Sequence, residues 1–144
     1  MSWDQLADEL GTDPVLAQLD SAAIEAVVDV LAAVVYADGR ASTMEVIELE
    51  AQLDRLPWLA EKKAAVHARV AAATEGRSDP AAAARRVAGA LSDAGAREKV
   101  FAMAAALAAA DFTVRSDERA VLESVGEGLG LDAATRARLI DAAG

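Results

Sequence analysis

Four carboxylates at matching positions of an internal sequence repeat are the residues of this chain best suited to chemistry. Asp38 and Glu45 occur in one segment, and Asp111 and Glu118 occur at the same places in a similar segment further along. In both copies an apolar helical pattern ends near the Asp, a short loop follows, and the Glu opens the next helical pattern. Carboxylate oxygens are the ligands that hard divalent cations prefer, so the chemistry this set could support is metal binding.

The position of each carboxylate relative to the apolar residues directs it toward the interior. Asp38 follows Val34 by four residues and Glu118 precedes Leu122 by four, which places each acid on the apolar face of its helix. Both aspartates also fall at helix C-termini, where the helix dipole disfavours an anion by roughly 0.3–1 kcal/mol. This repeated placement calls for a compensating cation.

Neither loop can bind a metal as an EF-hand by itself. The spacing of the glycine and the glutamate in the first loop matches the second half of an EF-hand, but the first two ligand positions hold Val34 and Tyr36. The corresponding positions of the second copy hold Leu107 and Ala109. A metal site would therefore combine an Asp and a Glu from each copy.

An interpretation without metal stays open beside this one. Glu45 and Glu118 stand at helix N-termini, where they would cap their helices and interact favourably with the dipole. Asp38 and Asp111 would then accept backbone N–H groups in the loops or pair with arginines. The arginines near enough in sequence are Arg40, Arg115 and Arg119.

The helical patterns predict an all-α fold. Expected helices, separated by proline and glycine, span residues 2–10, 14–19, 21–38, 43–56, 58–74, 81–91, 96–111, 116–129 and a last segment after Asp132. We expect Asp20 or Ser21 to start the third of these helices and Asp132 to cap the last. The order of elements in residues 13–75 resembles that in 79–143, and neither half alone could bury much surface. We therefore predict a single domain, residues 1–144, that forms one compact bundle of seven to nine helices with an internal pseudo-two-fold duplication.

Composition limits the residue types available for the core and the classes of possible partner. Hydrophobic residues make up 54% of the chain but aromatic residues only 3%, so the core must be built mainly from Ala, Val and Leu. The formal net charge of −10 would repel nucleic-acid phosphates and anionic membrane surfaces, which argues against both as partners. The absence of cysteine excludes disulfides and thiolate metal sites.

The residue sets of common enzymes are missing from this sequence. The only histidine is His67, and Ala64 stands three residues before it, so the Glu-x-x-His pairs of a di-iron bundle are absent. One histidine and no cysteine exclude the usual nucleophile–base sets. The glycines in 126–130 stand at a helix end, where we expect Gly130 to terminate the helix, and this segment lacks the lysine of a phosphate loop. We expect a protein that is not an enzyme, with His67 at a surface or boundary position.

Two further features have structural interpretations. Trp3, with Leu6 and Leu10, lies on a short amphipathic helix that we expect to fold back over the core. The pair Arg85 and Arg86 forms a small basic spot that we expect to be solvated.

The sequence also predicts a cytoplasmic location. The N-terminal residues lack the basic and apolar regions of a signal peptide. The longest apolar run, residues 100–110, is about half of the ~20 residues that cross a bilayer, so we expect no direct membrane insertion.

The doubled motif resembles the TerB (tellurite-resistance protein B-like) family. The resemblance covers roughly residues 21–140. Its first motif is Tyr36-Ala37-Asp38-Gly39 with Glu45 and Leu49. Its second is Ala110-Asp111 with Glu118 and Leu122, and it departs from the pattern because Phe112 stands where Gly is usual.

The resemblance implies a helical, duplicated, non-enzymatic module that acts in stress responses such as tellurite resistance. It implies that Asp38, Glu45, Asp111 and Glu118 bind a divalent metal (Ca²⁺, Mg²⁺, Mn²⁺ or Zn²⁺). It also implies protein partners, some of them membrane-associated, and it is compatible with a homo-oligomer. The alternative is a purely structural protein–protein interaction module, in which the acids are helix caps and salt bridges.

Overall fold

The computed structural model describes residues 3–36, 43–75, 79–109 and 116–143, and only the backbone of Glu45 and of residues 73–75. Within these ranges every regular element is helical, which confirms the predicted all-α class. The internal duplication and the domain bounds stay predictions. The elements are α1 (Trp3–Leu10), the 3₁₀ helix η1 (Leu16–Gln18), α2 (Ser21–Val35), α3 (Thr43–Leu53), α4 (Pro57–Ala60), α5 (Lys63–Glu75), α6 (Pro80–Ala90), α7 (Ala94–Ala108), α8 (Ser116–Gly128) and α9 (Ala133–Ala143).

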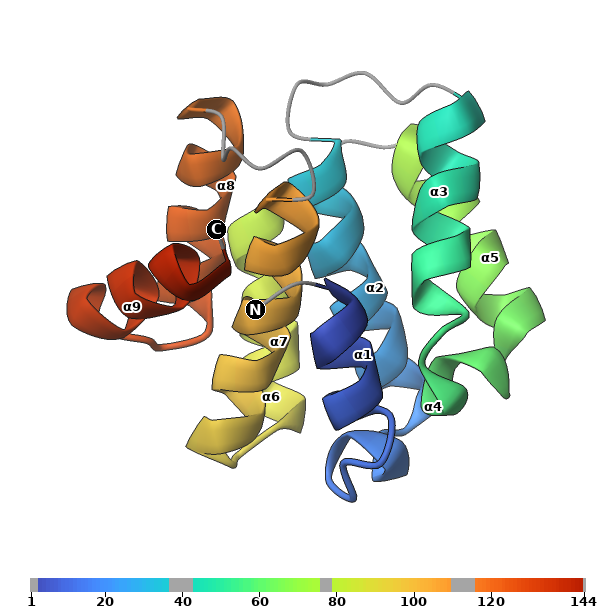
Figure 1. Ribbon diagram of the computed structural model, residues 1–144, viewed down its shortest axis with the longest axis horizontal. Coiled ribbons are helices and arrows are strands. Elements are labelled where there is room, and N and C mark those ends of the chain that lie inside the picture. Colours follow the sequence, from blue (N-terminus) through green and yellow to red (C-terminus); the bar gives the residue numbers. More distant parts are fainter. Residues whose placement is uncertain (1–2, 37–42, 76–78, 110–115, 144) are drawn as a thin grey trace.

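Helix α2 lies at the centre of the bundle and contacts α5, α6, α7 and α8 (Figure 1). Helices α8 and α9 lie on one side of the bundle, and α3, α4 and α5 lie on the other. Helix α1 packs against α7, and α6 packs against both α2 and α8. Because α2 and α7 lie between the two sides of the bundle, residues at their ends can lie near residues from either side.

One connected core of small aliphatic side chains joins all of these helices. It extends from Trp3 to Ile140, and Phe101 is its only fully buried aromatic side chain among the described residues. Long alanine-rich stretches of α7 are buried, which lets neighbouring backbones approach closely. Trp3 is 7% exposed and its Nε1 donates to the Gln52 carbonyl, so α1 does fold over the core as predicted.

Aspartates cap the helix N-termini as the sequence predicts. The Asp20 carboxylate accepts the N–H of Ala23 at the start of α2, and Asp132 accepts that of Thr135 at the start of α9. Each bond satisfies one of the N–H groups that a first helical turn leaves unpaired.

Gly130 ends α8 with a φ of +78°, the left-handed conformation that favours glycine. The N–H of Leu131 then donates to Gly126 O, and the N–H of Gly130 donates to Glu127 O. These two bonds form a Schellman motif, so the predicted termination at Gly130 is confirmed.

Several predicted helices differ from those observed. Helices α2 and α7 end at Val35 and Ala108, three residues before the ends expected at Asp38 and Asp111. The segment expected to be helical over 58–74 is broken into α4 and α5, because an i→i+3 bond from the Lys62 N–H to Leu59 O tightens the backbone and ends α4. The helix expected over 14–19 is the 3₁₀ turn η1. Its backbone is held by Asp13, which accepts from Val15 and Leu16.

Candidate functional site

The helix ends next to the four predicted carboxylates lie at one end of the bundle. The C-terminal ends of α2 and α7 and the N-terminal ends of α3 and α8 all lie at the upper end in Figure 1. Helices α2 and α7 contact each other, whereas α3 and α8 lie on opposite sides of that pair. A shared site would therefore lie over the ends of α2 and α7.

Glu118 is the one predicted ligand whose side chain the structure describes. It lies in the first turn of α8 and is only 7% exposed. The N-terminus of a helix favours a negative charge at this position. Asp38 and Asp111 lie outside the described residues, and Glu45 belongs to α3 but its side chain is not described. The convergence of the four carboxylates therefore stays a prediction.

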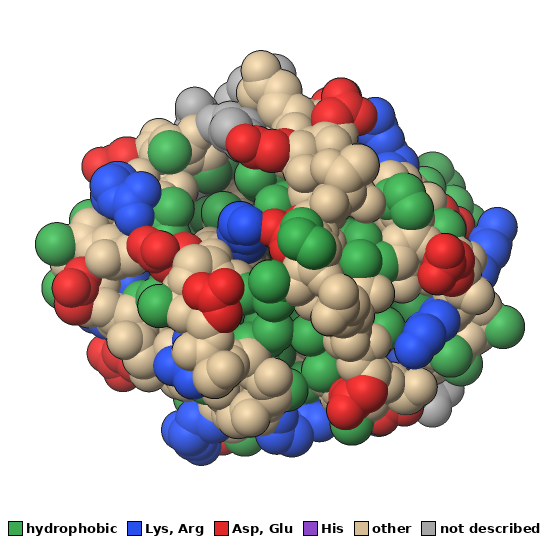
Figure 2. Space-filling model, turned by 90° about the horizontal axis from the view of Figure 1, so that it is seen from below, with side chains coloured by type: hydrophobic (Ala, Val, Ile, Leu, Met, Phe, Trp, Pro, Cys, Tyr) green, Lys and Arg blue, Asp and Glu red, His purple; other side chains and the backbone are tan. Residues whose placement is uncertain are grey.

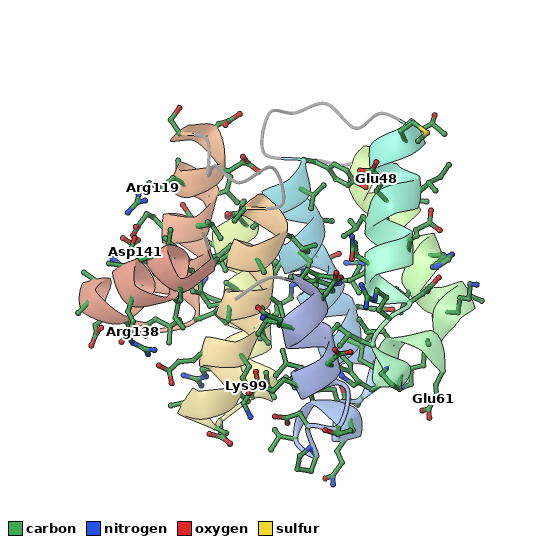
Figure 3. The ribbon with its side chains drawn as sticks, viewed as in Figure 1. Glu48, Glu61, Lys99, Arg119, Arg138 and Asp141 are labelled. Atoms are coloured by element: carbon green, nitrogen blue, oxygen red, sulfur yellow. The ribbon has the colours of Figure 1, made fainter. Side chains whose placement is uncertain are left out.

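Among the described side chains no group of three or more His, Cys, Asp or Glu residues has the geometry of a metal site. Arg119, a candidate partner of the predicted acids, is exposed on α8 and points outward from the bundle (Figure 3).

A buried ion-pair cluster that the sequence analysis missed joins α2, α5 and α6. Asp29, 2% exposed, accepts two hydrogen bonds from Arg69, from Nε at 2.7 Å and from Nη2 at 2.6 Å. Arg86 donates to the same carboxylate at 2.7 Å. The hydrogen bond with Asp29 raises the pKa of Arg69, against the opposing effect of burial. Arg86 keeps 51% of its side chain exposed, but it is an ion-pair partner and not merely the solvated spot expected.

The signal for Asp29 was present in the sequence. It stands inside the apolar stripe of α2, directly between Val28 and Val30, where a charged residue must be paired to be buried. Its partners come from two other helices far along the chain, so spacing alone could not identify them. The cluster holds three helices together and is saturated by its own partners, so we assign it a structural role.

His67 forms a second polar link, between α5 and the end of α3. Its Nδ1 lies 2.6 Å from a Glu50 carboxylate oxygen and its Nε2 lies 2.9 Å from Asp54 Oδ1. The two ring nitrogens point in different directions, so the three side chains do not converge on one point where a metal could bind. The imidazole is 26% exposed, which confirms the boundary position predicted for it.

A groove of about 340 Å³ opens between α1, α7 and the end of α9. Most of its lining is apolar, and an ion pair between Asp13 and Lys99 lies at its polar edge. Burial opposes the ionisation of Asp13, but hydrogen bonds from Lys99 and from the Leu16 and Val15 amides, with the charge of Lys99, lower its pKa. The hydrogen bond to Asp13 is in turn the main reason that the pKa of Lys99 is raised. The ion pair is therefore fully charged at neutral pH.

The described residues define an all-α protein, a bundle of short helices around an aliphatic core. The family model described as Tellurite resistance protein TerB matches residues 24–141, so the chain belongs to the TerB family. This match confirms the resemblance carried by the doubled acidic motif. Comparison with curated proteins and with solved structures gives no significant match. No helix in the described ranges has the length and apolar character needed to cross a membrane.

Proposed function

We propose that this TerB-family protein is a non-enzymatic metal-binding module that acts in a stress response of the tellurite-resistance kind through protein partners. Membership in the family supports this proposal. The observation that carries it furthest is the common end of the bundle shared by the helix ends next to Asp38, Glu45, Asp111 and Glu118. A cytoplasmic location belongs to the same proposal.

The donor set fits a hard divalent cation. Asp38 and Asp111 follow the C-termini of α2 and α7, where backbone carbonyls leave partial negative charge. A cation there would offset that charge, and the carboxylates of Glu45 and Glu118 would complete an all-oxygen set suited to Ca²⁺, Mg²⁺ or Mn²⁺. The low exposure of Glu118 agrees with a carboxylate that does not face solvent.

Thermal unfolding with and without metal tests this proposal. Protein stripped with a chelator is melted alone and with Ca²⁺, Mg²⁺, Mn²⁺ or Zn²⁺. A cation present at 100 times its dissociation constant stabilises the folded state by about 2.7 kcal/mol, which for a chain of this size raises Tm by about 5–10 °C. We expect this rise for wild type and its loss in the Asp38→Asn/Asp111→Asn double variant.

The Asp8→Asn/Asp141→Asn variant is the matched control, because it removes the same charge from exposed positions on α1 and α9. It should keep the full rise in Tm. The single variants distinguish one shared metal site from two separate sites. If the site is shared, Asp38→Asn alone abolishes the rise in Tm. If there are two sites, Asp38→Asn leaves one of them intact and part of the rise remains. No rise in wild type with any of the four ions would overturn the metal proposal.

The alternative is an interaction module without metal, and one observation favours it. Met44 and Ile47 on α3 are 64% and 53% exposed, which is unusual for large apolar side chains next to the acidic motif. In that case the double Asp variant would be as stable as wild type or more stable, with or without metal, because two anions would have been removed from helix C-termini.

A further inference from the structure

We propose that the groove between α1, α7 and α9 binds a basic amphipathic helical segment of a protein partner. The apolar side chains of that segment would enter the groove, and a Lys or Arg beside them would face the acidic rim. This inference rests on the part of the proposed function in which the protein acts through protein partners, and it names the chemistry of one.

The shape of the groove suits a few apolar side chains. Its apolar walls come from three helices: Leu6 and Leu10 from α1, Ala102 from α7, and Leu139, Ala142 and Ala143 from α9. Its volume of about 340 Å³ is at the lower end of the range for ligand pockets. A partner helix presents apolar side chains at i, i+3 or i+4, and i+7 to grooves of this kind.

The charges around the groove select a basic partner. Glu9 and Asp13 line it, and Asp93 and Glu9 act electrostatically on Lys99, the one cation among the described residues of its lining. Lys99 is already engaged by the buried Asp13, so an anionic ligand would have to break that ion pair. With Asp13 and Lys99 paired, the charge that remains in the described lining is the negative charge of Glu9, and the whole chain carries −10. Complementary charges accelerate association and suppress partners of the wrong sign.

The lower face of the molecule carries both hydrophobic and charged side chains (Figure 2). Hydrophobic side chains gather at its centre, and acidic and basic side chains are spread around them (Figure 2). Lys99 lies toward the lower end of α7 beside α1 (Figure 3). The metal is proposed beyond the opposite end of α7, a helix of 15 residues. The groove can therefore be altered without touching the proposed metal ligands.

Selection from a random peptide library displayed on phage tests the proposal on the full chain. The selected peptides are synthesised with a fluorescent label, and their binding is measured by fluorescence anisotropy. Ala142→Trp fills the groove from an exposed position of α9, and Glu9→Lys reverses the charge of an exposed rim residue. The matched controls are Ala68→Trp and Glu61→Lys, which make the same changes at exposed positions outside the groove lining.

We expect the selected peptides to share apolar residues at helical spacing with Lys or Arg beside them. Ala142→Trp should weaken their binding at least tenfold, Glu9→Lys should weaken it severalfold at low salt, and neither control should change it. The proposal is overturned if no peptide is enriched, if the selected peptides are acidic, or if the groove variants bind as tightly as the controls.

Two further measurements distinguish lost peptide binding from misfolding and from a failure of the metal proposal. Circular dichroism shows whether Ala142→Trp folds, and if it does not, Glu9→Lys, whose side chain is exposed, decides the question alone. The metal-dependent melt of the Glu9→Lys variant should match wild type. If wild type binds no peptide but keeps its metal response, the groove proposal alone is overturned, whereas a missing metal response in wild type overturns the metal proposal alone.

Discussion

The residue-scale features of this protein are buried carboxylates paired with partly exposed basic side chains. Asp29 is nearly inaccessible at 2% exposure and accepts from both Arg69 and Arg86. An ionised carboxylate removed from water is costly unless hydrogen bonds replace its hydration. The three-residue cluster therefore ties α5 and α6 to the central helix, and it makes the stability of the bundle sensitive to one acid.

Asp29→Asn should lower the free energy of unfolding by about 1–3 kcal/mol, because an amide cannot replace the charge-assisted bonds from two guanidinium groups. The two arginines are 36% and 51% exposed and can turn toward water, which limits the loss. Urea denaturation measures the change, with the exposed Asp8→Asn as the control that should leave the midpoint unchanged. An unchanged midpoint in Asp29→Asn would show that the cluster does not stabilise the fold.

The Asp13–Lys99 pair should give a defined pH dependence. Because the pKa of Asp13 is lowered from its usual 3.8, its contribution to stability is complete above about pH 4 and is lost as pH falls through the folded-state value. The pKa of Lys99 is raised from 10.5, so its contribution is complete below that pH and is lost as pH rises further. The stability difference between wild type and Asp13→Asn should therefore be constant from pH 5 to 9 and shrink below pH 4. Urea melts at a series of pH values measure it, and a difference that does not shrink as pH falls below 4 would contradict the assignment.

At the scale of elements, sequence predicts the existence of helices better than their breaks. Caps and terminators act locally, so Asp20, Asp132 and Gly130 could be identified from the sequence and are confirmed. The break between α4 and α5 could not, because residues 58–74 contain no internal proline or glycine and the turn depends on a single tightened bond at Lys62. The groove was also missed, because three helices distant in sequence form it.

Close packing of α8 on α6 requires a glycine. A Cβ on Gly128 would lie 2.7 Å from both the Ala81 carbonyl oxygen and Ala84 Cβ, closer than atoms can pack. Gly128→Ala should therefore destabilise the fold by about 1–3 kcal/mol, because the two backbones must separate. Gly89, in α6 with open space around it, is the matched control. Gly89→Ala should stabilise by up to about 1 kcal/mol through helix propensity. Thermal melts of both variants test this, and equal effects of the same sign would contradict it.

At the scale of the whole molecule, the helix ends next to the predicted metal ligands lie at one end of the bundle, and Lys99 of the groove lies toward the opposite end of α7. The sequence predicted the all-α class and the family because both depend on local patterns that recur along the chain. It also placed the acidic motifs next to the ends of α2 and α7, which contact each other. Pairing across the fold, as in the Asp29 cluster, could not be read from spacing. A metal site at the common end would link the two sides of the bundle through these central helices.

The most direct measurement of the central claim is NMR of the ¹⁵N-labelled protein titrated with Mn²⁺, because a bound paramagnetic ion broadens the amide signals near it. We predict that broadening begins at Tyr36, Thr43, Ala109 and Ser116, which flank the proposed ligands at the ends of α2, α3, α7 and α8. Amides of α4 and of the end of α6, which lie toward the opposite end of the bundle, should stay sharp, and Asp38→Asn/Asp111→Asn should abolish the effect. Broadening spread evenly over the acidic surface, or centred elsewhere, would contradict a metal site at this end of the bundle.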